Sequence, residues 1–167
     1  MKKAGPGTRK WIKGFHLTFA GVWTGAAICL VLTNFVKIPV ENGDELYGIL
    51  ASARLIDDYI IIPAAMGSLL TGLLISLFTN WGFFRHWWVI VKWGATVAMV
   101  LFGTFFLGPW LNGMEEMTEK MRAAALAEPV FFHNLAMNRW FGTVQVALLV
   151  VLIFISVFRP WGKRGVK

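Results

Sequence analysis

Charged residues and cysteine are scarce in this chain of 167 residues. Charged side chains make up 15% of it and hydrophobic ones 57%, a balance outside the range of ordinary soluble domains. The single cysteine, Cys29, excludes an internal disulfide and a CxxCH motif, and therefore a covalently attached c-type haem. The sequence also lacks the HExxH motif of zinc hydrolases, a phosphate-binding loop, and a serine or cysteine with an identifiable base. Hydrolytic chemistry therefore finds no support in this sequence.

The most prominent feature of the sequence is a set of long apolar runs. Four of them reach the length of about 20 residues that crosses the roughly 30 Å hydrocarbon core of a bilayer: approximately 15–35, 59–79, 87–107 and 140–158. They predict an all-α, four-transmembrane-helix bundle and an integral membrane protein with a single domain, residues 1–167. The basic head leads into an apolar run too long for a signal peptide, so we expect the first span to be retained.

The uneven distribution of charge predicts an orientation for this bundle. The net charge is +7, and eleven of the 16 basic residues fall at the two ends of the chain or near the turn after the second span. All nine acidic residues belong to the opposite side. The positive-inside rule therefore predicts that both termini are cytoplasmic, in a bacterial inner (plasma) membrane. Basic ends suit anionic lipid head groups, so the lipid bilayer, and not nucleic acid, is the expected partner.

Small residues predict how the spans pack together. In the first span, Gly21 and Gly25 form a small-xxx-small pattern that would let a neighbouring backbone approach closely. Four residues of that span share one helical face, which we expect to look into the bundle: His16, Ala20, Trp23 and Ala27. In the second span a small residue recurs every four positions, as expected for tight helix packing: Ala64, Ser68, Gly72 and Ser76.

The outer connections are predicted from polar residues, glycine and proline. We expect residues 37–58 to form an outer loop, with Asp57 and Asp58 binding amides at the start of the second span; a proton or cation entrance is the alternative. Gly108 and Pro109 are expected to end the third helix. An amphipathic helix is predicted in the outer loop between spans three and four, and Pro129 begins a helix that continues into span four.

Two histidines predict a cofactor site. His16 and His86 lie at the cytoplasmic ends of spans one and three, and therefore at similar depth. A b-type haem needs axial side chains from two helices and cations for its propionates, which Lys13, Arg85 and Lys92 would supply. The predicted role is electron transfer with a quinone or a redox partner protein. The alternative is that the two histidines make only structural hydrogen bonds.

The outer segment contains a second candidate metal site. Imidazole and thioether groups suit Cu(I), and the segment supplies His133, Met137, Met114, Met117 and Met121. These residues would form a copper-binding or copper-transport site. The alternative is that the methionines fill gaps between helices, as methionine commonly does. A third possibility is a structural or assembly subunit without a cofactor. The sequence leaves open whether the protein is an enzyme, and it is compatible with a homo-oligomer.

Several short stretches resemble a known family. Residues 13–16 (KGFH) and 19–26 (FAGVWTGA) resemble the first span of small bacterial integral membrane proteins related to the membrane domain of copper-resistance protein D. Residues 57–63 (DDYIIIP) and 71–74 (TGLL), with Trp87 and Lys92, are similar to the second and third spans of those proteins. The resemblance covers roughly residues 11–108. It implies a bundle of four or more helices and either copper import or a haem-binding, cytochrome-like role.

Overall fold

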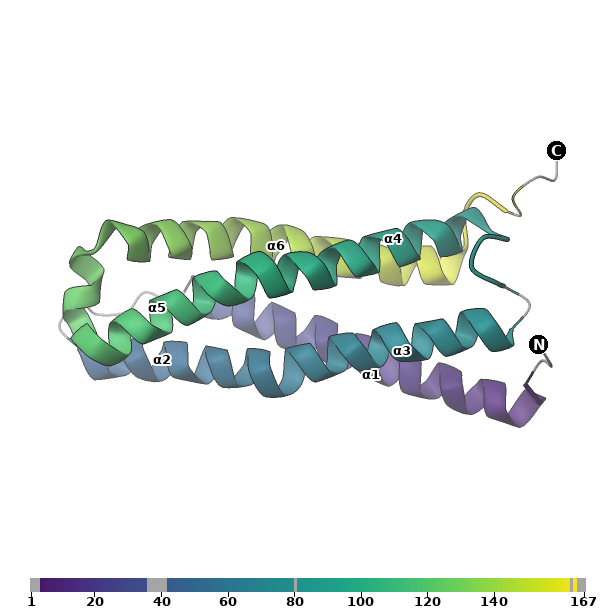
Figure 1. Ribbon diagram of the computed structural model, residues 1–167, viewed down its shortest axis with the longest axis horizontal. Helices are drawn as coiled ribbons and strands as arrows, with labels where there is room; N and C mark the ends of the chain where they lie inside the picture. Colours follow the sequence, from purple (N-terminus) through teal and green to yellow (C-terminus); the bar gives the residue numbers. More distant parts are fainter. Residues whose placement is uncertain (1–3, 36–41, 80, 163, 165–167) are drawn as a thin grey trace.

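Four helical columns run along one common axis (Figure 1). The computed structural model describes residues 4–35, 42–79, 81–162 and 164. The first column is α1 (Pro6–Thr33), and the second joins α2 (Gly43–Ile56), η1 (Asp57–Ile61) and α3 (Ile62–Phe78). The third joins α4 (Trp87–Phe102), η2 (Gly103–Leu107) and α5 (Gly108–Met121), followed by the 3₁₀ segment η3 (Arg122–Ala127). The fourth is α6 (Pro129–Phe158), which begins at the predicted proline.

All four columns are long and apolar enough to cross a membrane. Their outward faces carry large apolar side chains, of which Leu17 is 70% exposed, Phe105 66% and Val157 69%. Side chains of this kind over the outside of a bundle are suited to acyl chains and not to water. The chain is therefore an integral membrane protein, and its prediction as an all-helical bundle with four spans is confirmed.

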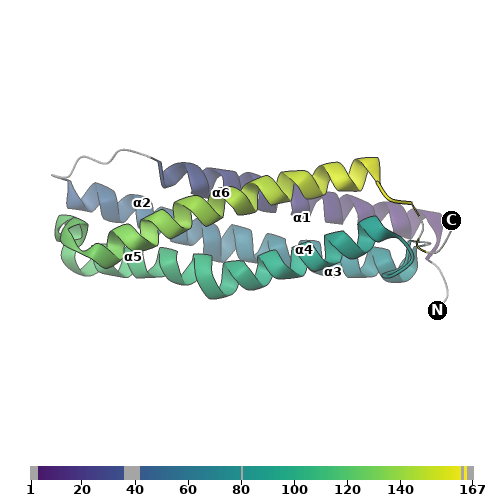
Figure 2. The same ribbon diagram turned by 90° about the horizontal axis from the view of Figure 1, so that it is seen from above.

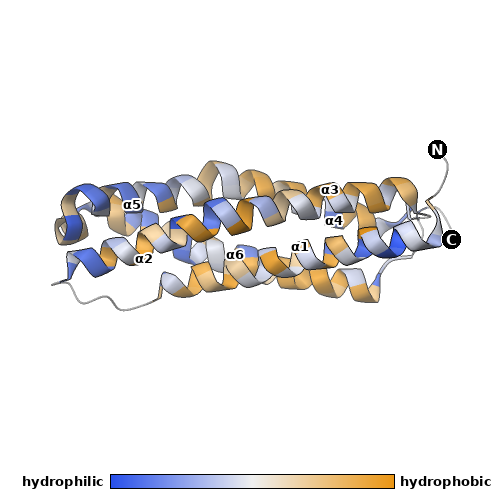
Figure 3. Ribbon diagram, turned by 90° about the horizontal axis from the view of Figure 1, so that it is seen from below, coloured by the Kyte–Doolittle hydropathy of each residue, from blue (hydrophilic) through white to orange (hydrophobic). Residues whose placement is uncertain are grey.

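The two ends of the bundle differ in composition. The start of α1, the link between α3 and α4 and the end of α6 lie together at what we call the terminal end (Figures 1 and 2). The opposite, distal end is formed by α2, α5 and η3, and it is the more hydrophilic (Figure 3). The second column has 36 residues. At about 1.5 Å per residue it is about 54 Å long, so it extends past the roughly 30 Å hydrocarbon core.

The second column begins earlier than predicted. We expected a loop through residue 58, but α2 starts at Gly43, where the side chain of Asn42 accepts a hydrogen bond of 3.1 Å from the Glu45 N–H. Asn42 therefore caps the helix, and apolar residues at helical spacing bury its inner face: Leu46, Leu50 and Ala53. Asp57 and Asp58 consequently lie in the middle of a column, and their predicted role at a first helical turn is wrong.

The third column also continues where we expected it to end. Gly108 and Pro109 do not stop it, because a π-helical turn, η2, precedes them: the Gly108 N–H bonds the Gly103 carbonyl five residues earlier. The second column has the same arrangement, since the Ile62 N–H bonds the Asp57 carbonyl just before Pro63. Proline lacks an N–H, and its ring clashes with the carbonyl four residues before it. A wider turn accommodates that ring, so each helix passes through its proline.

The columns pack closely at some predicted positions and not at others. α1 packs most extensively on α3, where Ala64, Ser68 and Ser76 are buried as predicted. By contrast, a Cβ atom placed on Gly21 or Gly25 would meet no described atom within 4 Å, so the close approach predicted there is wrong within this chain. Two apolar clusters fill the interior. The distal core contains Leu30, Leu46, Leu50, Ala53, Leu111, Met114, Ala125 and Phe131. The central core contains Trp23, Ala64, Ala65, Met99, Leu149 and Leu152.

Candidate functional site

His16 lies on the inward face of α1, as predicted, and its ring is held by α3. Its Nδ1 is 3.1 Å from the carbonyl oxygen of Ser68 and 3.0 Å from Oγ1 of Thr71. The Thr71 hydroxyl in turn donates to the Gly67 carbonyl at 2.6 Å. A carbonyl oxygen can only accept, so Nδ1 of His16 carries the proton. The neutral imidazole therefore keeps its lone pair on Nε2, which is the arrangement found in metal-ligating histidines.

The imidazole of His16 packs beside a glycine on α3. A Cβ atom at Gly72 would lie 3.4 Å from Cε1 of His16, which is ordinary van der Waals contact, so the ring lies directly against this face of α3. The predicted stripe of small residues on the second span thus serves the histidine as well as the packing of the helices.

His86 lies at the same end of the bundle but in a different setting. It directly precedes α4, and its Nδ1 is 3.0 Å from the carbonyl oxygen of Trp81. Its ring centroid is 6.2 Å from that of Trp88. The hydrogen bonds and ring contacts of the described residues do not link His86 to His16. Nδ1 of His86 is nevertheless paired with a carbonyl, as in His16, so Nε2 is again the nitrogen with the lone pair.

The cations predicted to surround the site gather at the terminal end. Lys92 is half-buried in α4 and donates a hydrogen bond to Ser156 of α6; among the described residues it has no acidic partner. Lys13 lies 4.8 Å above the ring of Trp81, and Arg85 is exposed in the link before α4. α1, α3, α4 and α6 contain no acidic residue. The terminal end therefore combines positive charge with an oriented imidazole.

The residues predicted to bind copper lie in different surroundings. Met114 is fully buried in the distal core, and Met117 packs against that core. Met121 is 39% exposed at the end of α5, whereas His133 is exposed on α6 and Met137 is half-buried one turn further on. In the part of the chain that the structure describes, no three His, Cys, Asp or Glu residues gather as a metal ion would require.

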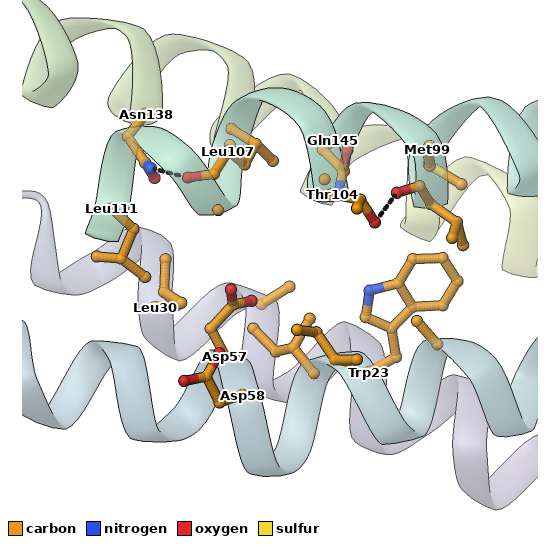
Figure 4. Close-up of a pocket in the computed structure, with 18 of the residues that line it drawn as sticks. Trp23, Leu30, Asp57, Asp58, Met99, Thr104, Leu107, Leu111, Asn138 and Gln145 are labelled. Carbon is orange, nitrogen blue, oxygen red and sulfur yellow. Dashed lines mark hydrogen bonds between the residues drawn. The ribbon is translucent and has the colours of Figure 1, made fainter. Parts of the chain in front are cut away.

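A cavity lies between the four columns, and it is lined by Asp57 and Asp58, for which a proton or cation entrance was the alternative prediction. Its volume is about 260 Å³, and both π-helical turns line it (Figure 4). Apolar side chains form most of its wall. The polar groups are few: α1 contributes the indole nitrogen of Trp23, and the other three columns contribute Asp57, Asp58, Thr104, Asn112, Asn138 and Gln145.

Asp57 is the most unusual of these groups. Its carboxylate has neither a hydrogen bond nor an ion pair among the described residues, although Arg54 is one turn away. Arg54 instead binds Glu115 at 2.6 Å and approaches Asp58 at 3.7 Å. A Cβ at Gly108 would lie 3.9 Å from Oδ2 of Asp57, so the carboxylate lies beside the start of α5 in the third column. An ionisable group within a membrane bundle and without a partner is a candidate functional group.

A buried donor also faces this cavity. Trp23 is only 3% exposed, and its indole nitrogen is directed into the open space (Figure 4). No hydrogen-bond acceptor for that N–H is found in residues 4–35, 42–79, 81–162 or 164. The side-chain oxygen of Asn112, by contrast, is fully buried without a partner in the described part of the chain. The indole N–H is open to the cavity, so a ligand there would find a free donor.

Known proteins do not identify this site. Comparison with protein families, curated proteins and solved structures finds no match to the chain. The resemblance to the membrane domain of copper-resistance protein D therefore stays a prediction. The function has to be argued from the side chains themselves.

One pattern in the sequence could have indicated the cavity. Asp57 and Gly103 each stand six residues before a proline, and each begins a π-helical turn. Such turns are frequent at functional sites. The repeated spacing is visible in the sequence. Among the described residues, Asp57 and the indole N–H of Trp23 have no hydrogen-bond partner, and this depends on which residues of the other columns lie beside them.

Proposed function

We propose that this protein binds a b-type haem through Nε2 of His16 and carries electrons in the membrane. The observation that supports this most directly is the contact between Nδ1 of His16 and the Ser68 carbonyl. A haem-ligating histidine needs its second nitrogen held in this way, because the hydrogen bond fixes both the tautomer and the ring orientation. A bound haem would supply one-electron redox chemistry.

The charges at the terminal end support the same ligand. Haem carries two propionates, and the half-buried Lys92 has no acidic partner among the described residues. Lys13 and Arg85 provide further positive charge at the edge of the bundle. His86 is the proposed second ligand, because its Nδ1 is also bonded to a carbonyl. Its Nε2 would complete the coordination from the side of α4.

The surroundings of the protein follow from its charges. We place the terminal end in the cytoplasm of a bacterial cell and α5, as the amphipathic outer helix, on the other side of the inner membrane. A membrane quinone or a redox partner protein would exchange electrons with the haem. The resemblance to the copper-resistance protein D membrane domain, for which a cytochrome-like role is one expectation, is consistent with this proposal.

An absorption spectrum of the detergent-purified protein tests the proposal. Protein from haem-supplied cells should show a Soret band, and His16→Ala should abolish it. His133→Ala, which replaces an exposed histidine of the distal half, should leave the band unchanged. A colourless wild-type preparation would contradict haem binding, and copper analysis of the same sample would then test the site around His133 and Met137.

A further inference from the structure

The cavity between the four columns opens to the side of the bundle. Ile62 and Met66 line it and are 49% and 43% exposed, and Thr104 and Pro109 across from them are exposed as well. Its back wall is buried, since Trp23, Leu111 and Asn138 are at most 3% exposed. The mouth therefore lies between the second and third columns. In a membrane, a molecule dissolved among the acyl chains could reach it.

The hydrogen-bonding groups without partners in this cavity indicate which groups a ligand must carry. Asp57 supplies an acceptor and Trp23 a donor, and they lie toward opposite ends of the space, with Gln145 and Thr104 across from them (Figure 4). Among the described residues, no Lys, Arg or His lines the cavity. Both groups face the cavity without a partner among the described residues, so a ligand that pairs with both gains hydrogen bonds that the protein does not supply itself. That ligand must donate a hydrogen bond at one end and accept one at the other.

We infer that this cavity binds the ring of a lipid-soluble quinol. One quinol hydroxyl donates to the Asp57 carboxylate, and the oxygen at the other end of the ring accepts from the indole N–H of Trp23. The apolar wall contacts the flat ring, and the tail leaves through the mouth into the bilayer. A volume of about 260 Å³ is just below the range of about 300–1,000 Å³ typical of pockets for drug-sized ligands, which suits a ring group alone.

The charge of the cavity discriminates against other membrane ligands. A phosphate head group would be repelled by Asp57, because no cation among the described lining residues offsets its charge. A lipophilic cation would pair with Asp57 but would leave the N–H of Trp23 without an acceptor. A quinol satisfies both groups, and it also gives the proposed haem an electron donor. The inference deepens the proposed function in that respect, while the binding itself depends on Asp57 and Trp23 alone.

The Asp57 carboxylate should bind the reduced ring, the quinol, more tightly than the oxidised ring, the quinone. A quinol donates to Asp57 through a charge-assisted hydrogen bond, whereas the oxidised quinone has no hydroxyl to donate. Such bonds contribute about 1.5–3 kcal/mol, which corresponds to a preference of about tenfold or more for the reduced form. Asp57→Asn should remove most of that preference, because the uncharged amide oxygen accepts only an ordinary hydrogen bond from the quinol hydroxyl.

Anaerobic titration calorimetry on detergent-purified protein tests this site. The probes are menadiol and menadione, a quinol and quinone of one ring system without a tail. We expect wild type to bind menadiol about tenfold more tightly than menadione. Asp57→Asn should weaken menadiol binding about tenfold and change menadione binding little, and Trp23→Phe, which removes only the N–H from an aromatic wall, should weaken both. Asp44→Asn, at an exposed carboxylate of the distal end, is the matched control and should bind both probes as wild type does.

Three outcomes would contradict a quinol site in this cavity. The inference is overturned if wild type binds neither probe, if Asp57→Asn keeps the preference for menadiol, or if tetraphenylphosphonium binds at Asp57 while menadiol does not. His16→Ala separates this site from the haem proposal. If that variant binds menadiol with unchanged affinity, the quinol site stands even if the protein proves to lack haem. Haem-loaded wild type that fails to bind menadiol would remove the quinol site and leave the haem proposal intact.

Discussion

Nδ1 of His16 lies 3.1 Å from the carbonyl oxygen of Ser68, which is 52 residues further along the chain. This contact joins the first column to the second and also determines which imidazole nitrogen is available to a ligand. The Thr71 hydroxyl shares the same proton at 3.0 Å. The oriented state of His16 therefore depends on two groups of α3, one of which can be changed by mutation.

Replacing Thr71 tests whether the orientation of His16 matters to a ligand. Thr71→Val keeps the side-chain shape but removes an acceptor from Nδ1, so the ring is held by the Ser68 carbonyl alone. Loss of a group that positions a metal ligand commonly lowers metal affinity about 10–100-fold, and we expect haem affinity to fall within that range. Haem titration of apoprotein, followed at the Soret band, measures the change.

Thr143→Val provides the matched control for Thr71→Val. The Thr143 hydroxyl is exposed on α6 and bonds only the carbonyl of Arg139 in its own helix. This variant should bind haem as wild type does. Equal haem affinities for the two variants would show that Thr71 does not position His16.

Gly67 of α3 lies directly against the ring of Phe19 in α1. A Cβ at this position would lie 2.6 Å from the ring of Phe19, too close for any side chain. Gly67→Ala should therefore destabilise the bundle by about 1–3 kcal/mol, the usual cost of overpacking. Thermal unfolding in detergent, followed by circular dichroism, should show a lower melting temperature.

Gly25→Ala is the corresponding control on α1. A Cβ there meets no described atom within 4 Å, so the melting temperature should not fall. If Gly25→Ala proves as destabilising as Gly67→Ala, that face of α1 is covered by a second copy of the chain. If Gly67→Ala is as stable as wild type, the contact between Gly67 and Phe19 is looser than the structure indicates.

The ion pair between Arg54 and Glu115 joins α2 to α5 at the distal end. The side chain of Glu115 is 8% exposed, so Arg54→Met leaves a buried carboxylate without its cation. We expect a clear fall in melting temperature, because an uncompensated buried charge is more costly than the pair itself is favourable. The double variant Arg54→Met/Glu115→Met should recover much of the loss, and failure to recover would show that Arg54 acts through its other contacts.

The second ion pair of the distal end should behave differently. Asp44 binds Arg122 at 2.9 Å, but its side chain is 89% exposed. Exposed ion pairs contribute about 0–1 kcal/mol, so Asp44→Asn should leave the melting temperature nearly unchanged. The two substitutions together test whether burial, and not the distance between the charges, decides which pair stabilises the bundle.

Cysteine labelling in intact cells tests the proposed orientation. Cys29 can be replaced by serine to give a cysteine-free chain. In that background, Glu119→Cys at the distal end should react with a membrane-impermeant maleimide added from outside. Thr8→Cys at the terminal end should react only after the cells are opened. The reverse pattern would place the terminal end outside and contradict the positive-inside prediction.

Hydropathy and helical spacing were sufficient to predict some of this structure. The four spans follow from the length of the apolar runs, and the inward face of α1 follows from the spacing of His16 and Trp23. The role of the stripe on α3 follows from the recurrence of small residues every four positions. These features depend on local sequence alone, which is why they could be predicted.

Other features depend on contacts that no local pattern contains. Pro109 predicts a helix end unless a π turn accommodates its ring. Residues 37–58, which include α2, were predicted to be a loop because they contain Pro39, Gly43 and an acidic segment. The isolation of Asp57 among the described residues follows from the binding of Arg54 to Glu115, which lies 61 residues away. The relation between His16 and His86 likewise depends on how α4 sits against α1, which depth in the membrane does not determine.

The two π turns also fix the number of residues in their helices. Deleting one residue from a helix rotates the segment before it by about 100° relative to the segment after it. A π turn holds one residue more than an α turn, so a deletion within residues 57–61 would avoid this rotation: it would give an ordinary α turn, keep Leu46 and Leu50 of α2 on the distal core, and bring the ring of Pro63 against the carbonyl four residues before it. Single-residue deletions elsewhere in these columns should therefore be less well tolerated than deletions within the π turns, because only the π turns hold a residue that can be removed without turning one half of the bundle against the other.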